Sequence, residues 1–203
     1  MTKREESVRF FDFWASFYDT WLNPFRIWLT YIQKKVSQYS FKGKVLDVGC
    51  GTGDLLLMLD EKRRNKKAML NLCGIDISRK MLEKAKKNLG SKAKVQYGDV
   101  ENIPFKANYF DVVTSTEAFH HYEKAQKAIS EMHRVLKKNG LLFLADISIA
   151  NSVIRKLFFI IEPGHVKIYS KKEFRLLLEN AGFKVEKQER VGLLAVINIA
   201  KKS

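Results

Sequence analysis

The sequence contains few cysteines, few prolines and no long apolar run. Its two cysteines, Cys50 and Cys73, lack metal-ligand spacing and are too few for a disulfide framework. Apolar runs such as residues 157–161 are far too short to span a bilayer. The first residues lack the apolar core of a signal peptide, so we expect a cytoplasmic protein. These scarcities argue against a disulfide-stabilised secreted domain and against an integral membrane protein.

Acidic residues are scarce relative to basic ones. The chain has 22 Asp and Glu against 37 Lys and Arg, which gives a net charge of +15. Such an excess is compatible with nucleic acid, an anionic membrane or a well-solvated surface. Ten of the basic residues lie between positions 62 and 87, at the end of one predicted helix and along the outer face of the next. We favour a solvated lysine-rich helix face.

Strands and helices alternate from residue 44 onward, which indicates an α/β fold with a mostly parallel sheet and helices on both faces. The expected strands are 44–48, 70–76, 94–98, 110–115 and 140–147. Apolar residues at helical spacing predict three helices, at 78–90, 123–139 and 170–182, the last of which starts with a capping box. A short turn separates the final segments 183–190 and 193–200. They should therefore form a hairpin whose last strand is antiparallel to its neighbour.

The segment before the first strand is rich in aromatic side chains. Ten of the 22 residues from Phe10 to Tyr31 are aromatic. We expect a helix pair packed on the core, part of which covers a ligand or lines a pocket. The pocket role is expected chiefly of Phe17, Tyr18 and Asp19.

The most informative segment runs from Val45 to Asp54, where a short apolar strand leads through three alternate glycines into a helix. Glycine allows a sharp turn and a close approach of the backbone to a ligand. The spacing is G-x-G-x-G and not the G-x-G-x-x-G of dinucleotide-binding folds. Asp47 and Asp54 flank the loop, and carboxylates there would repel a phosphate but attract an ammonium or sulfonium group. The loop therefore suits a cationic nucleoside.

Further polar residues follow the next three predicted strands, at the edge where open α/β sheets bind ligands. Asp76 ends the second strand, where a carboxylate can accept hydrogen bonds from both hydroxyls of a ribose. Asp99 follows the third strand and could accept from an adenine amine, with Ile77 and Val100 packed beside the base. Residues 114–121, Thr-Ser-Thr-Glu-Ala-Phe-His-His, would close the site after the fourth strand.

These motifs resemble those of the class I S-adenosylmethionine-dependent methyltransferases, in the group that contains the ubiquinone and menaquinone C-methyltransferases (methyltransferase type 11). The matching segments are 45–53, 74–78 with Met81, 98–105, 110–113 with the two histidines, and 134–140. The resemblance extends from about residue 18 to residue 147. It implies a Rossmann-like fold with a seven-stranded sheet in the order 3-2-1-4-5-7-6 and strand 7 antiparallel. It also implies S-adenosylmethionine as cofactor and S-adenosylhomocysteine as product.

The resemblance implies roles residue by residue. The backbone of Gly49, Cys50 and Gly51 would meet the methionine part of the cofactor, and Asp47 would help to place its ammonium group. Asp76 would hold the ribose. The other implied contacts are Ile77 and Val100 on the faces of adenine, Asp99 on its amine, Met81 of the second motif, the backbone at Ser115 and Thr116 beside the sulfonium, and Tyr18 folded over it.

Methyl transfer from a sulfonium is an in-line displacement, so the protein mainly aligns the two reactants and excludes water. A phenol, enol or acidic carbon as acceptor also requires a base. The candidate bases are Glu117, His120 and His121, together with His165. The competing interpretation of the adjacent histidines is structural, with one packed against the protein and the other facing solvent. A metal site at this pair is not expected, because neighbouring residues rarely converge on one ion without further ligands.

The acceptor is expected to be small and apolar. The fourth-strand motif reads Thr-Ser-Thr-Glu. It does not resemble the Asn/Asp-Pro-Pro-aromatic motif of the methyltransferases that act on base amino groups, which argues against methylation of adenine or cytosine amines, or of glutamine. Residues 152–169 are mainly apolar, with basic residues between them, which suggests a pocket for an apolar molecule. Within one domain over 1–203, we therefore expect an N-terminal lid (1–40), a cofactor-binding core (41–147) and an acceptor side (148–203).

Two other functions remain open from the sequence. An RNA methyltransferase would bind RNA with the basic surface at residues 62–87. That surface, however, belongs to helices that lie away from the expected opening of the acceptor site. A noncatalytic S-adenosylmethionine-binding subunit would instead serve a partner chain.

Overall fold

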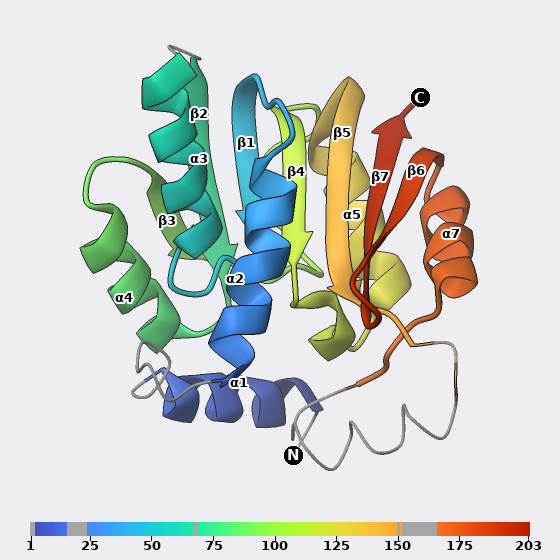
Figure 1. The fold of residues 1–203 in the computed structure, drawn as a ribbon, viewed down its shortest axis with the longest axis horizontal. Coiled ribbons are helices and arrows are strands. Elements are labelled where there is room, and N and C mark those ends of the chain that lie inside the picture. The colour runs from blue at the N-terminus through green and yellow to red at the C-terminus, as the bar shows by residue number, and fades with distance from the viewer. Residues whose placement is uncertain (1–2, 16–23, 67–68, 150, 152–165) are drawn as a thin grey trace.

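The computed structural model describes residues 3–15, 24–66, 69–149, 151 and 166–203 (Figure 1). Their centre is one sheet of seven strands: β1 (Gly43–Val48), β2 (Leu70–Asp76), β3 (Lys94–Tyr97), β4 (Phe110–Thr116), β5 (Leu136–Ile147), β6 (Phe183–Val191) and β7 (Ala195–Lys202). Their order is β3-β2-β1-β4-β5-β7-β6. The first five strands are parallel, and β7 is antiparallel to both β5 and β6. This confirms the predicted fold class, strand order and terminal hairpin.

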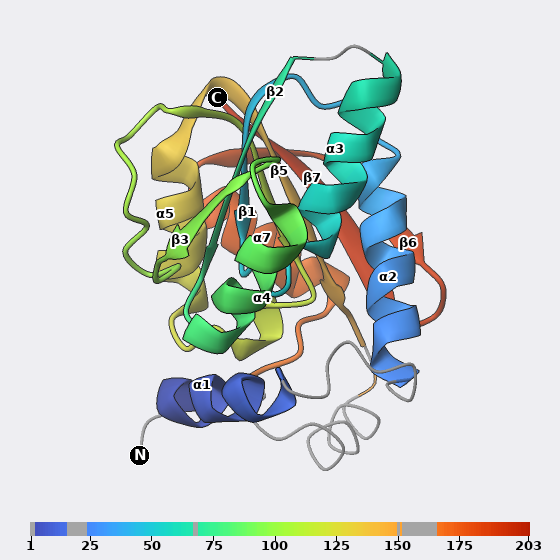
Figure 2. The ribbon, with the colours of Figure 1, turned by 90° about the vertical axis from the view of Figure 1, so that its left-hand side faces the viewer.

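Helices cover both faces of the sheet, as Figure 2 shows from the side. They are α1 (Lys3–Trp14), α2 (Pro24–Ser37), α3 (Asp54–Lys66), α4 (Arg79–Leu89), α5 (Ala125–Val135) and α7 (Lys171–Asn180), with a short 3-10 turn η1 (Phe119–His121). Successive residues of a strand point to opposite faces, so Val45 and Leu46 enter two different cores. Helix α1 lies across the end of the molecule to which the parallel strands point (Figure 1). Of the predicted N-terminal helix pair, α1 lies at the carboxyl edge of the sheet, and α2 packs along one face against α3, β4 and β5.

The helix predicted to end at Asn139 ends at Val135 instead. Leu136 has extended backbone angles, and β5 begins there. Asn139 has a φ of +63°, and a Cβ on Gly140 would lie 2.8 Å from the carbonyl oxygen of Lys137. The Asn-Gly pair therefore makes a tight turn within the start of β5 and does not terminate the helix.

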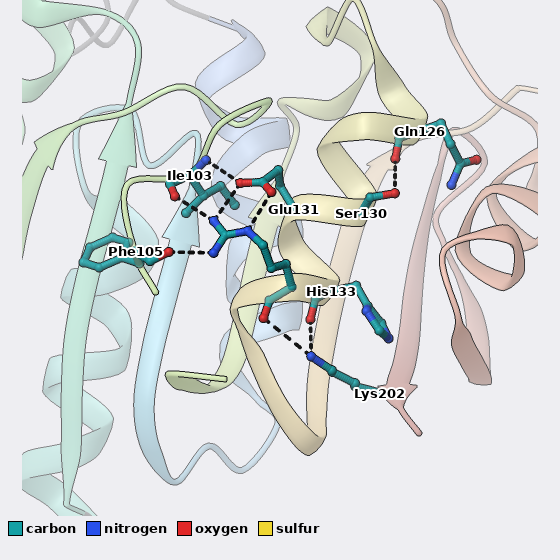
Figure 3. A network of polar contacts seen from close by, with 8 residues as sticks. Ile103, Phe105, Gln126, Ser130, Glu131, His133 and Lys202 are labelled. Carbon is teal, nitrogen blue, oxygen red and sulfur yellow. Dashed lines mark hydrogen bonds and ion pairs between the residues drawn. The ribbon is translucent and has the colours of Figure 1, made fainter. Parts of the chain in front are cut away.

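A second reason why α5 ends early is that a side chain of β7, the last strand, caps it. The Lys202 ammonium donates hydrogen bonds of 2.8 Å to the carbonyl oxygens of His133 and Leu136 (Figure 3 draws the first). A cation near the last carbonyl oxygens of a helix stabilises its C-terminus. Sequence periodicity carries no information about a contact made across 66 positions.

Arg134 of α5 anchors the segment that follows β3 (Figure 3). Its guanidinium donates to the carbonyl oxygens of Ile103 and Phe105, at 2.9 and 2.8 Å, and is paired with Glu131. The Glu131 carboxylate in turn accepts from the backbone N–H of Ile103. This network fixes the loop that begins at Asp99.

Among the described residues, no helix is both long enough and apolar enough to cross a membrane. The predicted pocket residues Phe17, Tyr18 and Asp19, and the candidate base His165, lie outside the described residues.

Candidate active site

A cavity lies at the carboxyl ends of β1 to β4, bounded also by α1 and α2. It is lined by three side chains of these helices, the glycine loop, and residues that follow each of the next three strands: Phe11, Leu29, Gln33, 48–52, 75–77, Met81, 98–101, 116–118 and 121–123. Most of the predicted site residues are brought together here: Gly49, Cys50, Gly51, Asp76, Ile77, Met81, Asp99, Val100, Thr116, Glu117 and His121. Asp47, Ser115 and His120 are not among the lining residues.

The amides of the glycine loop are already bonded within the fold. Gly49 and Cys50 donate to the carbonyl oxygen of Ile75 at 2.9 and 3.0 Å, and Gly51 donates to Asp76 Oδ2 at 2.8 Å. A phosphate-binding loop needs free N–H groups directed at the ligand. The amides of these three residues are therefore not free to bind a phosphate, in agreement with the carboxylates that flank the loop.

Asp76 connects the loop to the helix that follows β2. Its Oδ2 accepts from Gly51, and its Oδ1 accepts from the Ser78 backbone at 2.8 Å. Burial raises the pKa of this carboxyl, these backbone bonds oppose the rise, and the charge of Asp12 on α1 adds to it. Because each carboxylate oxygen has two lone pairs, Asp76 can still accept hydrogen bonds from a ligand in the cavity.

Asp47 lies behind the loop with an exposed fraction of only 2%. Its Oδ1 accepts from the Thr114 hydroxyl at 2.7 Å. Burial raises the pKa of Asp47 to about 7, the bond from Thr114 lowers it, and the nearby charge of Asp76 raises it further. Any influence of this carboxyl on a ligand must pass through the loop, because Asp47 does not line the cavity.

The part of the cavity next to β2 and β3 combines apolar and acidic side chains from the ends of these strands and from α4. Ile77, Met81 and Val100 supply apolar surface. Asp99 Oδ1 accepts from the Glu101 backbone at 2.9 Å, an intraloop bond that turns the chain after β3. The Arg134 network described above holds this loop from behind.

The adjacent histidines are both buried, with exposed fractions of 4% for His120 and 7% for His121. The expectation that one of them faces solvent is therefore wrong. His120 Nδ1 lies 2.6 Å from Asp146 Oδ1, while the other Asp146 oxygen accepts from the Phe119 backbone at 2.7 Å. His121 lines the cavity and packs edge-on against Phe11 of α1, with ring centroids 4.8 Å apart.

Sequence reasoning missed two polar residues at this end of the sheet. Tyr122 lines the cavity, donates to the Val48 carbonyl at 3.3 Å and lies 3.1 Å from the Ser115 hydroxyl. It directly follows the two histidines, so its place after the fourth strand was a usable signal. Asp146 is the partner of His120 from β5, and that pairing across 26 positions had no local signal.

The strand order, the cavity at the carboxyl edge and a glycine loop between β1 and α3 are those of a class I methyltransferase fold. Comparison with known proteins agrees, since the methyltransferase domain family matches residues 46–144. A ubiquinone/menaquinone biosynthesis C-methyltransferase of Campylobacter jejuni is 29% identical, over 75% of this chain and 76% of that protein. A demethylmenaquinone methyltransferase of Staphylococcus epidermidis is 32% identical, over 74% of this chain and 65% of the relative.

Solved structures share the fold. A chain from the complex of the Haloferax volcanii Trm112 methyltransferase activator with a methyltransferase superposes with a TM-score of 0.80, at 19% identity, over 94% of this chain and 96% of the other. An S-adenosylmethionine-dependent methyltransferase of Thermotoga maritima superposes with a TM-score of 0.75, at 20% identity, over 96% and 99%. The protein is an S-adenosylmethionine-dependent methyltransferase with the class I fold, and its cofactor is S-adenosylmethionine.

The residues present fit this cofactor. An adenosine offers hydroxyl and amine donors, and the strand ends offer the carboxylates Asp76 and Asp99. A Cβ built on Gly51 meets no atom within 4 Å, so the loop leaves room for a ligand beside its backbone. The bonded loop amides leave carbonyl oxygens as the available groups, and these suit an ammonium.

Proposed function

We propose that the enzyme transfers the methyl group to a small hydrophobic acceptor with an aromatic or quinone-like ring. The observation that carries this proposal is the composition of the cavity at the carboxyl ends of β1 to β4. The glycine loop and strand-end carboxylates line one part, and Phe11 and Leu29 of the N-terminal helices line another. The names of the two curated relatives refer to ubiquinone and menaquinone, which supports the same class of acceptor.

In this proposal Asp76 accepts hydrogen bonds from the ribose and Asp99 from the adenine amine. The loop backbone at Gly49, Cys50 and Gly51 meets the methionine part, and Asp47 adds negative charge from behind in its ionised form. The remaining proposed contacts are Ile77, Met81 and Val100 around adenine, the backbone of Ser115 and Thr116 beside the sulfonium, and Tyr18 as a cover.

When bound, the cofactor supplies a methyl group already activated by the positive sulfur. The residues of the chain then need to align the acceptor and exclude water, and no protein nucleophile is required. If the acceptor carries an acidic proton, Glu117 and His121 are the candidate bases that line the cavity. His120, fixed by Asp146, lies directly behind His121, with their ring centroids 4.1 Å apart. We therefore assign His120 to positioning in this scheme.

Incubation with methyl-labelled cofactor and fractionated cell extract tests the acceptor class. We expect label in the organic-solvent phase, and we expect it to be lost in the Asp76→Asn variant. Label recovered in RNA would overturn the hydrophobic acceptor and favour the basic surface as a binding site. Cofactor binding without label in any fraction would instead favour a noncatalytic subunit.

A further inference from the structure

Gln33 of α2 is a buried amide whose oxygen lacks a hydrogen-bond donor. Its side chain is only 6% exposed and lines the cavity beside Leu29. Its Oε1 has no hydrogen-bond partner among the described residues. Buried polar atoms are almost always paired, because an unpaired one keeps the full desolvation penalty. An oxygen left in this state inside a ligand cavity indicates that the ligand brings the donor.

The order of the strand ends shows which part of the ligand reaches Gln33. Asp99, Asp76 and the glycine loop follow β3, β2 and β1, which are neighbours in that order, and residues 116–118 follow β4 on the other side of β1. If adenosine lies against Asp99 and Asp76, as the proposed function has it, the amino-acid tail extends toward β1 and β4. Helix α2, which carries Gln33, packs against β4 and β5.

The chemistry of the tail selects one of its two charged groups. An amide oxygen only accepts hydrogen bonds, the ammonium only donates them, and the tail carboxylate only accepts. The amides of Gly49, Cys50 and Gly51 are bonded to Ile75 and Asp76, and the buried carboxyl of Asp47 does not line the cavity. Besides the loop carbonyl oxygens and the Glu117 carboxylate, Gln33 Oε1 is an acceptor in the cavity lining that has no donor among the described residues.

We propose that Gln33 binds the α-ammonium group of the cofactor through Oε1. This inference rests on the proposed function, and it makes α2 part of the cofactor site as well as of the acceptor wall. S-adenosylhomocysteine has the same ammonium, so Gln33 should recognise product and cofactor alike. It should be indifferent to a nucleoside that lacks the amino-acid tail.

Calorimetric titration with two nucleosides tests this. S-adenosylhomocysteine carries the tail, and 5′-methylthioadenosine has the same adenosine and thioether without it. We expect Gln33→Leu to weaken binding of S-adenosylhomocysteine by about tenfold or more, since the lost bond is to a charged group. Its affinity for 5′-methylthioadenosine should stay within about twofold of the wild type. The unliganded variant should melt no lower than the wild type, because an unpaired buried oxygen has been removed.

Gln38→Leu is the matched control, since Gln38 is exposed just beyond the end of the same helix. It should change neither affinity, whereas Gln33→Glu, which keeps an acceptor oxygen, should retain binding of S-adenosylhomocysteine. Equal weakening of both nucleosides by Gln33→Leu would overturn the proposal in favour of a structural role. If Gln33→Leu binds S-adenosylhomocysteine as tightly as the wild type but has a higher KM for the methyl acceptor, Gln33 belongs to the acceptor site instead. If the wild type binds neither nucleoside, the proposed function itself falls, and the Gln33 proposal falls with it.

Discussion

Two glycines of the loop, Gly49 and Gly51, share a left-handed backbone but have different surroundings. Their φ angles are +72° and +51°. A Cβ on Gly49 would lie 2.8 Å from the Cβ of Ala118 and 3.0 Å from the Tyr122 hydroxyl, whereas one on Gly51 meets nothing within 4 Å. The first position is thus closed by the protein, and the second is open toward the ligand.

Alanine at these two positions should separate folding from binding. Both variants bear the left-handed strain of about 1–2 kcal/mol. Gly49→Ala adds a steric clash and should lose clearly more stability in urea unfolding. Gly51→Ala should lose little beyond the strain, yet bind S-adenosylhomocysteine at least about tenfold more weakly, because its methyl group occupies ligand space. Normal binding by Gly51→Ala would show that the cofactor does not approach this residue.

Asp47 should make the free energy of unfolding depend on pH. Its pKa in the folded protein is about 7, above the ordinary value of 3.8 that applies when the chain is unfolded. Between these values the unfolded chain releases a proton that the folded chain keeps, so stability falls as pH rises from about 4 to about 7. Below pH 4 both states are protonated, and the group contributes nothing.

Asp47→Asn removes this penalty while keeping an oxygen for the Thr114 hydroxyl. Relative to the variant, the wild type should lose roughly 2–4 kcal/mol between pH 4 and pH 8, with most of the loss complete by about pH 7. Urea unfolding at several pH values measures the difference. Parallel pH profiles for the two proteins would mean that Asp47 titrates normally.

At the scale of the element, α7 begins at a complete capping box. The Ser170 hydroxyl accepts from the Glu173 backbone, and the Glu173 carboxylate accepts from the Ser170 backbone at 2.7 Å. Burial opposes ionisation here, but hydrogen bonds from Lys167 and Ser170 dominate and lower the pKa of Glu173 to about 2. The charged form that completes the box is therefore present at neutral pH.

Ser170→Ala should lower the free energy of unfolding by about 1 kcal/mol, because the Glu173 amide in the first turn of α7 loses its acceptor. Ser130→Ala is the control, since its exposed hydroxyl donates to the Gln126 carbonyl one turn back in the same helix (Figure 3). We expect the control to change stability by less than about 0.5 kcal/mol. Equal losses in the two variants, measured by urea unfolding, would argue against the cap.

Elements whose signals are local could be predicted from the sequence, and contacts between distant elements could not. The capping box at Ser170, the glycine loop and the strand-end aspartates all depend on short spacings, and the fold places them as expected. The end of α5 depends on Lys202, and the environment of Gln33 depends on how α2 packs on the sheet. Neither can be read from nearby residues. The binding roles, the domain division and the cytoplasmic location stay predictions.

At the scale of the whole molecule, some of the excess basic residues make hydrogen bonds and ion pairs that hold the fold together. Lys62 donates to the carbonyl oxygens of Ser37 and Tyr39, which joins α3 to the segment before β1. Arg63 and Arg64 are paired with the buried Asp60. By contrast, Lys80, Lys86 and Lys87 of α4 are exposed.

Reversal of these three α4 charges should leave methyl transfer unchanged. If the acceptor is a small apolar molecule, Lys80→Glu, Lys86→Glu and Lys87→Glu together remove no contact with either reactant. The rate of label transfer to the organic phase should then match that of the wild type at low and at high salt. A large fall in the rate at low salt, in a variant that still melts normally, would indicate an anionic macromolecular acceptor bound by this surface.

The central claim is that strand-end carboxylates hold the nucleoside of S-adenosylmethionine, and calorimetric titration of Asp76→Asn tests it most directly. Asp111→Asn is a matched control, because Asp111 also accepts a backbone N–H, from Lys44, but sits near the amino end of β4. We expect one nucleoside bound per wild-type chain, an affinity lower by about tenfold or more in Asp76→Asn, and nearly full affinity in Asp111→Asn. Wild-type affinity in Asp76→Asn, or no binding by the wild type, would contradict the account.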